Sequence, residues 1–222
     1  FLEDGILAAA APGTVMIDSS TIDVGSAQAV HEAAKSAGFN MIDAPVSGGV
    51  IGADAGTLTF MCGGDKDSFE KAKPILQGMG KNIVHCGSGG LGQATKICNN
   101  MLAGINALAA AEAMTMGERL GVPPDTLYKV ISTSTGRSYI FETSNPMPDV
   151  CSTSPANNKF KPGFMAKLML KDLRLSQAAA QDAKTSTPLG AAATAAFQQL
   201  IDSGFGDLDT SSIIKVIKPE SK

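Results

Sequence analysis

The chain has 222 residues, of which 44% are apolar, and a formal net charge of −3. This length and composition suit one large or two smaller globular domains. The acidic balance offers no basic field for nucleic acid, and no apolar run approaches the roughly 18 residues of a membrane-spanning helix, so neither nucleic acid nor membrane is an expected partner.

The first ninety residues alternate short apolar runs with helical patterns. We expect strands at 14–18, 40–46, 57–62 and 82–86, and helices at 2–11, 23–37 and 67–79, the last opened by a capping box of Asp67 and Glu70. Strands that alternate with helices indicate an α/β sheet that is at least partly parallel, although strands joined by a short loop can also pair antiparallel.

Beyond residue 90 the pattern is helical throughout. We expect helices at 91–120, 124–134, 164–184, 188–203 and 210–216, with a long proline-containing loop between Thr143 and Pro162. The predicted fold is therefore the α/β remnant of a Rossmann-type domain (residues 1–89) followed by an all-α domain (residues 90–222), joined by one long interdomain helix.

The glycine cluster from Gly87 to Gly92 matches GxGxxG, the pattern of dinucleotide-binding turns. That motif requires a second strand after the helix, with an acidic residue at its end, and here Glu112 still lies inside the predicted long helix. We therefore interpret these glycines as tight turns at a domain junction.

Lys96 and Asn100 lie one helical turn apart near the start of the long predicted helix, so they share a face. On spacing alone they are ordinary surface residues. Their small, apolar neighbours instead indicate a largely buried helix, where desolvation and the helix dipole disfavour the charged form of the lysine. Such a lysine can exchange a proton near neutral pH.

Two loops are further candidates for binding. In Ser47-Gly48-Gly49, successive N–H groups and a hydroxyl form a receptor for a carboxylate, and a plain surface turn is the alternative interpretation. Ser20-Thr21 reads first as a helix cap. The cysteines (Cys62, Cys86, Cys98 and Cys151) have no CxxC spacing and only two histidines beside them, which argues against a metal site, favours a reducing compartment and leaves them as core filler.

Three motifs in the same order resemble those of the β-hydroxyacid dehydrogenases: DAPVSGG (43–49), GSGGLGQATKICNN (87–100) and KDLRLSQ (171–177). The loop around residues 144–160 and the PGFMAKLMLKDL stretch are similar to the 3-hydroxyisobutyrate dehydrogenases of that family. The resemblance covers nearly the whole chain. It implies an NAD-dependent oxidation of a small 3-hydroxy acid, 3-hydroxyisobutyrate to methylmalonate semialdehyde in valine catabolism.

The resemblance also implies roles for individual residues. Lys96 matches the catalytic lysine and Asn100 the residue that positions the substrate. The remaining matches are Ser47, Gly48 and Gly49 in the carboxylate-binding loop, Thr21 and Lys171 near the NAD cofactor, and Phe164 and Asp172, which shape and orient the substrate site. From spacing alone, Phe164 reads as a core aromatic on the 164–184 helix, and Lys171 with Asp172 as a solvated pair.

The chain departs from the family at its beginning. The first strand, the true GxGxxG turn and the ribose-binding acidic residue do not precede Phe1, which is neither a start methionine nor a signal-peptide start. We therefore expect a fragment of a larger enzyme, with a related NADPH-dependent semialdehyde or glyoxylate reductase, or a non-catalytic interaction subunit, as alternatives. The family further implies a homodimer or homotetramer, in the mitochondrial matrix if eukaryotic and in the cytoplasm if bacterial.

Overall fold

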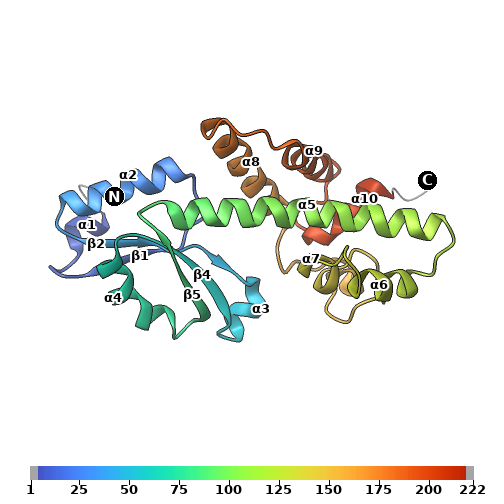
Figure 1. Cartoon of the computed structure of the whole chain (residues 1–222), viewed down its shortest axis with the longest axis horizontal. Helices are drawn as coiled ribbons and strands as arrows, with labels where there is room; N and C mark the ends of the chain where they lie inside the picture. The colour runs from blue at the N-terminus through green and yellow to red at the C-terminus, as the bar shows by residue number, and fades with distance from the viewer. Residues whose placement is uncertain (1–4, 219–222) are drawn as a thin grey trace. The chain divides into compact units, whose positions relative to one another are not determined.

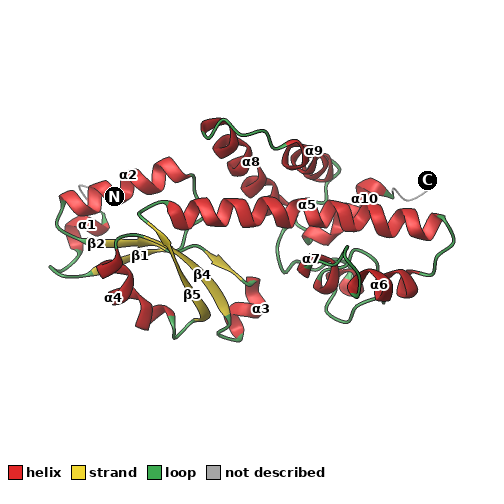
Figure 2. Cartoon of the chain, viewed as in Figure 1, coloured by secondary structure: helices red, strands yellow, loops and turns green. Residues whose placement is uncertain are grey.

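The computed structural model describes residues 5–218, and the opening of the first predicted helix lies outside them. The chain divides into two compact units, Phe1–Cys98 and Asn99–Lys222, which we call the sheet unit and the helical unit. Figures 1 and 2 show their elements, with all strands in the sheet unit. The predicted α/β part followed by an all-helical part is confirmed.

The sheet unit closely follows the predicted alternation of strands and helices. Its elements are α1 (Ile6–Ala9), β1 (Val15–Asp18), α2 (Val24–Ser36), β2 (Asn40–Asp43), β3 (Val46–Ser47), α3 (Gly49–Asp54), β4 (Leu58–Gly63), α4 (Lys66–Leu76) and β5 (Gly80–Gly87). Strand β1 is parallel to β2 and β4 is parallel to β5, whereas β4 pairs antiparallel with both β2 and β3. The sheet is thus mixed, as the short loops allowed.

Alternating side chains of the strands build a core on each face of the sheet. On β2, Met41 joins a cluster with helices α1 and α2, whereas Ile42 joins a cluster with Phe69 and Leu76 of α4. Successive strand residues point to opposite faces, so neighbours on β2 serve different cores. Helix α4 therefore covers the face of the sheet opposite to α1 and α2 (Figure 1).

Three local predictions in the sheet unit are wrong. The N-cap of α2 is Asp23, whose carboxylate accepts from the Ser26 N–H, and not Ser20 or Thr21. The N-cap of α4 is Asp65, whose carboxylate accepts from the Ser68 N–H at 2.8 Å, so the capping box assigned to Asp67 and Glu70 does not form the start of this helix. The Ser47-Gly48-Gly49 segment is not a plain loop, because Ser47 ends β3 and Gly49 begins α3. Glycine and β-branched residues are poor helix formers, which hid α3 from a propensity argument.

The helical unit is built around helix α5 (Leu91–Arg119), which begins in the sheet unit. The other elements are α6 (Pro124–Ser132), α7 (Tyr139–Thr143), η1 (Pro155–Asn158), α8 (Ala166–Asp182), α9 (Pro188–Asp202), η2 (Thr210–Ile213) and α10 (Ile214–Ile217). Ala107, Ala111 and Met114 of α5 pack with Leu173 of α8 and Phe197 of α9 in one buried cluster. Small alanines let these helices approach closely.

The structure corrects two further expectations. Phe164 precedes α8, which begins only at Ala166, so it is not a helical residue. Cys62 and Cys151 are buried, but Cys86 is only partly buried and Cys98 is exposed, so the cysteines are not all core filler.

No helix among residues 5–218 is long and apolar enough to span a membrane. Within the same residues no cluster of His, Cys, Asp and Glu has the make-up of a metal site.

Candidate active site

Lys96 is buried at the start of α5, with 9% of its surface exposed. Its Nζ donates a hydrogen bond of 2.7 Å to the carbonyl oxygen of Val46. Val46 directly precedes Ser47, Gly48 and Gly49, so the sheet unit brings the predicted lysine next to the predicted carboxylate-binding loop. Sequence spacing could not show this, because Lys96 and Val46 are fifty positions apart.

The Ser47-Gly48-Gly49 segment has a structural reason for its glycines as well. Gly48 has a φ of 135°, and a Cβ built there would come within 3.0 Å of the Leu58 side chain. A residue other than glycine would be strained at this φ. The backbone at Gly48 and Gly49 is exposed, which leaves this segment accessible to a small solute.

The glycine cluster before α5 packs against the protein itself. A Cβ at Gly89 would collide with the His31 ring, and a Cβ at Gly92 would lie 2.7 Å from the carbonyl oxygen of Asp43. These glycines allow α5 to approach the sheet and α2 closely. Close packing gives these glycines a structural reason, in keeping with their interpretation as tight turns.

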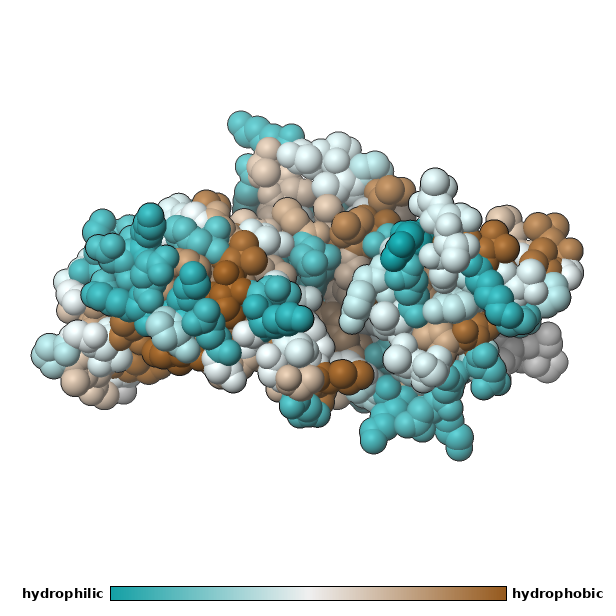
Figure 3. Space-filling model, turned by 60° about the horizontal axis from the view of Figure 1, so that its bottom comes forward, coloured by the Kyte–Doolittle hydropathy of each residue, from teal (hydrophilic) through white to brown (hydrophobic). Residues whose placement is uncertain are grey.

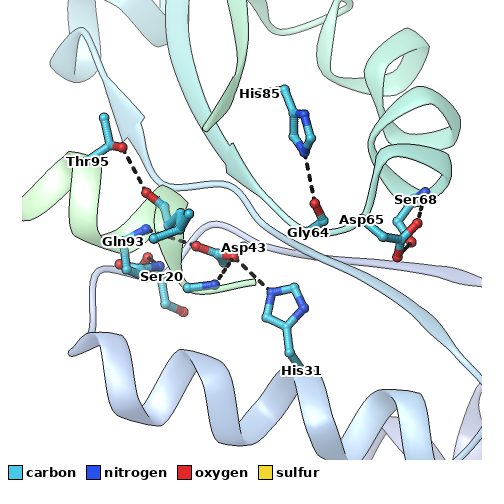
Figure 4. A network of polar contacts seen from close by, with 11 residues as sticks. Ser20, His31, Asp43, Gly64, Asp65, Ser68, His85, Gln93 and Thr95 are labelled. Carbon is cyan, nitrogen blue, oxygen red and sulfur yellow. Dashed lines mark hydrogen bonds and ion pairs between the residues drawn. The ribbon is translucent and has the colours of Figure 1, made fainter. Parts of the chain in front are cut away.

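Asp43 at the end of β2 fixes the start of α5. Its buried carboxylate accepts from the N–H groups of Gly90 at 2.8 Å and Gln93 at 2.9 Å, and from His31 Nε2 at 2.8 Å (Figure 4). The first N–H groups of a helix lack partners within the helix, and an anion at this end also complements the helix dipole. Burial alone would raise the pKa of Asp43, but the hydrogen bonds from His31, Gly90 and Gln93 outweigh it and hold this pKa below its usual value.

Gln93 connects the same helix start to the loop after β1. Its side chain is fully buried, accepts from the Ile22 N–H at 3.2 Å and donates to the Ser20 carbonyl oxygen at 2.7 Å. These two residues flank Thr21, which is half-buried at the carboxyl end of β1. Sequence reasoning missed both Asp43 and Gln93, although both stand inside the motifs that carry the family resemblance.

In the helical unit, Asn100 is held by Asp172. The Asn100 Nδ2 donates to Asp172 Oδ2 at 2.5 Å, and its Oδ1 accepts from Asn99 Nδ2 at 2.9 Å. Asp172 is 3% exposed, so it is not the solvated residue that spacing suggested. Lys171 Nζ lies 3.0 Å from Asp172 Oδ1, an ion-pair distance without hydrogen-bond geometry, and its side chain is about half exposed.

Phe164 lies in a turn that Asp209 organises. The buried Asp209 carboxylate accepts from the N–H groups of Gly163 and Phe164, both at 3.0 Å, and from the Ser211 hydroxyl at 2.8 Å. The Phe164 ring is half-buried against the core of the helical unit. Within this unit the structure thus links Asn100 with Asp172, whereas Phe164 is held through a separate network.

Two family models together match almost the whole chain. Residues 1–87 match the NAD binding domain of 6-phosphogluconate dehydrogenase, and residues 90–217 match the NAD-binding domain of NADP-dependent 3-hydroxyisobutyrate dehydrogenase. The second match covers more than half of the sequence. The chain belongs to the 3-hydroxyisobutyrate dehydrogenase family. This is a family of NAD(P)-dependent oxidoreductases, as the resemblance of the three motifs implied.

Individual relatives agree with this membership. A solved structure of the Mycobacterium tuberculosis 3-hydroxyisobutyrate dehydrogenase with L-serine has 45% identity and a TM-score of 0.91, over 96% of this chain and 73% of that one. An NAD-dependent L-serine dehydrogenase of Pseudomonas aeruginosa is 44% identical over 98% of this chain and 73% of its own length. A probable mitochondrial 3-hydroxyisobutyrate dehydrogenase of Dictyostelium discoideum is 43% identical over 99% of this chain and 68% of its own length.

Each unit carries one of the two residues that the resemblance assigns to the NAD(P) cofactor, and each residue has a group of suitable chemistry. Thr21 carries a hydroxyl at the carboxyl ends of parallel strands, where ligands of open α/β sheets bind, and Lys171 carries a partly exposed ammonium group. Both groups can donate hydrogen bonds to ribose hydroxyls or to phosphate oxygens. The glycines between Gly87 and Gly92 pack against the protein itself, and we do not assign them to the cofactor.

Proposed function

We propose that this chain takes part in the NAD-dependent oxidation of 3-hydroxyisobutyrate to methylmalonate semialdehyde, a step of valine breakdown, with Lys96 as general acid/base. The hydrogen bond from Lys96 Nζ to the Val46 carbonyl oxygen, immediately before the Ser47-Gly48-Gly49 segment, carries the proposal. A 3-hydroxy acid whose carboxylate is bound by this segment would have its hydroxyl group within reach of the lysine.

Lys96 acts as the base in its neutral form. A neutral amine has two N–H groups and one lone pair, so Lys96 can keep its hydrogen bond to the Val46 carbonyl oxygen and still accept the hydroxyl proton of the substrate. In the reverse direction the resulting ammonium group returns this proton to the carbonyl oxygen of the aldehyde. Burial of Lys96 keeps water away from this transfer.

When bound, NAD⁺ supplies the acceptor for the hydride that leaves the hydroxyl-bearing carbon. We assign Thr21 and Lys171 to cofactor binding, and Asn100, Phe164 and Asp172 to positioning of the substrate. The hydrogen bond from Asp172 restricts the rotamers of Asn100, which supports a role in which the amide has to point in one direction. Residues 1–89 would then be the C-terminal part of the cofactor-binding domain.

L-Serine is a second candidate substrate. One relative is named an L-serine dehydrogenase, and the solved structure of another contains L-serine. L-Serine is itself a 3-hydroxy acid, so the same carboxylate loop and the same lysine would serve it. The two candidates differ at the carbon next to the carboxylate, where 3-hydroxyisobutyrate has a methyl group and L-serine an ammonium group.

Assembly and compartment are part of the proposal. Apolar side chains are exposed on the helical unit, and apolar patches interrupt the polar surface in Figure 3; the exposed residues include Leu102, Met116, Leu120 and Leu189. These support a homodimer or homotetramer. We propose the mitochondrial matrix if the source is eukaryotic, as for the relative from Dictyostelium discoideum, and the cytoplasm if it is bacterial.

The test is a substrate panel with the full-length protein. NADH formation is followed at the nicotinamide absorbance band with 3-hydroxyisobutyrate and L-serine, and the reverse reaction is followed with glyoxylate and succinic semialdehyde. We expect NAD-dependent turnover of 3-hydroxyisobutyrate, and in Lys96→Ala a loss of about three orders of magnitude in kcat with NADH binding retained. Lys81→Ala, at an exposed position of β5, is the matched control and should turn over normally.

Three experimental results would contradict parts of this proposal. A preference for glyoxylate or succinic semialdehyde with NADPH would replace it by a reductase. Absence of turnover together with absence of NADH binding would favour a non-catalytic family member. Turnover retained in Lys96→Ala would remove the acid/base role from Lys96.

A further inference from the structure

Gln93 holds two backbone groups that flank Thr21. Its Nε2 donates to the Ser20 carbonyl oxygen at 2.7 Å, and its Oε1 accepts from the Ile22 N–H at 3.2 Å. Figure 4 shows the Gln93 side chain directed toward Ser20. The amide thereby fixes the path of the loop on both sides of Thr21, although Gln93 lies 71 positions from Ile22 in the sequence.

The backbone of Gln93 is fixed from the other side. Its N–H donates to Asp43 Oδ2 at 2.9 Å, and the same carboxylate also receives the Gly90 N–H and the His31 ring. Lys96 follows less than one helical turn later on α5 and bonds to the Val46 carbonyl oxygen. Gln93 is therefore a rigid connection between the loop of Thr21 and the helix turn that carries Lys96.

Glutamine suits this position because its amide carries a donor and an acceptor at the same distance along the side chain. The donor serves the main-chain carbonyl of Ser20, and the acceptor serves the main-chain N–H of Ile22. An ionised glutamate keeps the acceptor and loses the donor, while methionine has a similar size and provides neither. Since Gln93 is fully buried, water does not replace a lost partner there. The amide does not titrate, so it works alike at every pH.

We propose that Gln93 is a positioning residue that sets the separation between the cofactor-facing Thr21 loop and the Lys96 amine. The functional meaning of this separation rests on the proposed function. The connection between the Thr21 loop and helix α5 through Gln93 rests on the hydrogen bonds alone. An error of about 1 Å in the placement of reacting groups can cost on the order of 100-fold in rate. Gln93 contacts neither reacting group and acts through the loop and the helix.

The test uses Gln93→Met and Gln93→Glu in the full-length protein. We expect kcat/KM with 3-hydroxyisobutyrate to fall about 10- to 100-fold in Gln93→Met at every pH. In Gln93→Glu, kcat/KM relative to the wild type at the same pH should be equally low at pH 8 and should rise as the pH is lowered. The reason is that a protonated carboxyl group again donates to the Ser20 carbonyl oxygen. This pH-dependent rescue would not follow from a general loss of stability.

Ser68→Ala is the matched control. Ser68 is also fully buried, and its hydroxyl bonds to Asp65 and to Asn40 at the opposite end of β2 from Asp43. This variant should keep the wild-type kcat/KM. Hydrogen exchange of the peptide spanning residues 19–23 gives a readout without turnover, because the Ile22 N–H should exchange faster in Gln93→Met than in the wild type or in Ser68→Ala.

The outcomes separate this inference from the proposed function. Wild-type kcat/KM in both Gln93 variants overturns the positioning role, even if exchange at residues 19–23 is faster. If Gln93→Met does not fold, the pH profile of Gln93→Glu decides, and a flat profile overturns the role. If the wild type oxidises no 3-hydroxy acid, the proposed function fails, and NADH binding then tests Gln93 alone: weaker binding in Gln93→Met supports the link and unchanged binding overturns it.

Discussion

Replacing Asp43 by asparagine tests how the start of α5 is held against the sheet. The fully buried carboxylate of Asp43 accepts hydrogen bonds of 2.8 Å from His31, 2.8 Å from the Gly90 N–H and 2.9 Å from the Gln93 N–H. An asparagine keeps one oxygen as an acceptor, but its NH₂ group replaces the second oxygen and would face an N–H donor. At least one N–H group at the helix start then loses its partner.

The magnitude follows from the burial and the charge. A hydrogen bond to a charged group contributes about 1.5–3 kcal/mol, and a buried donor left without an acceptor costs about 1–3 kcal/mol. Burying the neutral amide costs less than burying the carboxylate, which offsets part of the loss. We expect Asp43→Asn to lower the free energy of unfolding by about 2–5 kcal/mol, from these contributions together. This is a large share of the roughly 5–15 kcal/mol of a typical domain.

The assay is urea unfolding of the full-length wild type and variant across pH. Because the folded-state pKa of Asp43 is held below its unfolded value, the stabilisation is present above the unfolded pKa and is lost as the pH falls through the folded pKa. The difference between wild type and Asp43→Asn should therefore be full at pH 7 and shrink below about pH 4.

Asp65→Asn is the control for a carboxylate that caps a helix at the surface. It keeps an N-capping side chain at the exposed start of α4, because asparagine caps a helix about as well as aspartate does, and should therefore cost well below about 1 kcal/mol at pH 7. A loss below about 1 kcal/mol in Asp43→Asn, or a difference from the wild type that persists unchanged in acid, would refute the anchoring of α5 by Asp43.

Three further predictions concern other parts of the two units. Asn100→Ala and Asp172→Asn should each lower kcat/KM about 10- to 100-fold in steady-state assays, and their double mutant should lose little more, because one hydrogen bond joins them. Gly92→Ala should lower the urea midpoint by the equivalent of about 1–3 kcal/mol through overpacking, whereas Gly25→Ala on exposed α2 should not lower it. Asp209→Ala should speed hydrogen exchange in the turn before α8, and unchanged exchange there would contradict its role.

The long helix and the order of the elements were predictable from the sequence. Residues 91–119 contain no proline and many good helix formers, and the strands stand out as short apolar runs bounded by glycine or polar residues. The wrong boundaries have local causes. Asp65 and Asp67 are both plausible caps of one helix, and α3 begins in a glycine-rich segment with weak helix propensity.

The sequence motifs predicted candidate residues of the site, but not the contacts between them. Lys96 could be expected on a buried helix turn, but its bond to the Val46 carbonyl oxygen depends on strand placement. Asp43 and Gln93 look like ordinary polar residues in the sequence. Their importance arises because each bonds to backbone groups about 50 to 70 positions away, and no local pattern encodes such partners.

The role of Lys96 as general acid/base is tested most directly by chemical rescue. In full-length Lys96→Ala, kcat for 3-hydroxyisobutyrate with NAD⁺ is measured with and without added methylamine, a primary amine small enough to take the place of the missing side chain. We predict that kcat falls by about three orders of magnitude and that methylamine restores part of it in a concentration-dependent way. A kcat in Lys96→Ala close to that of the wild type, without any response to the amine, would contradict the account.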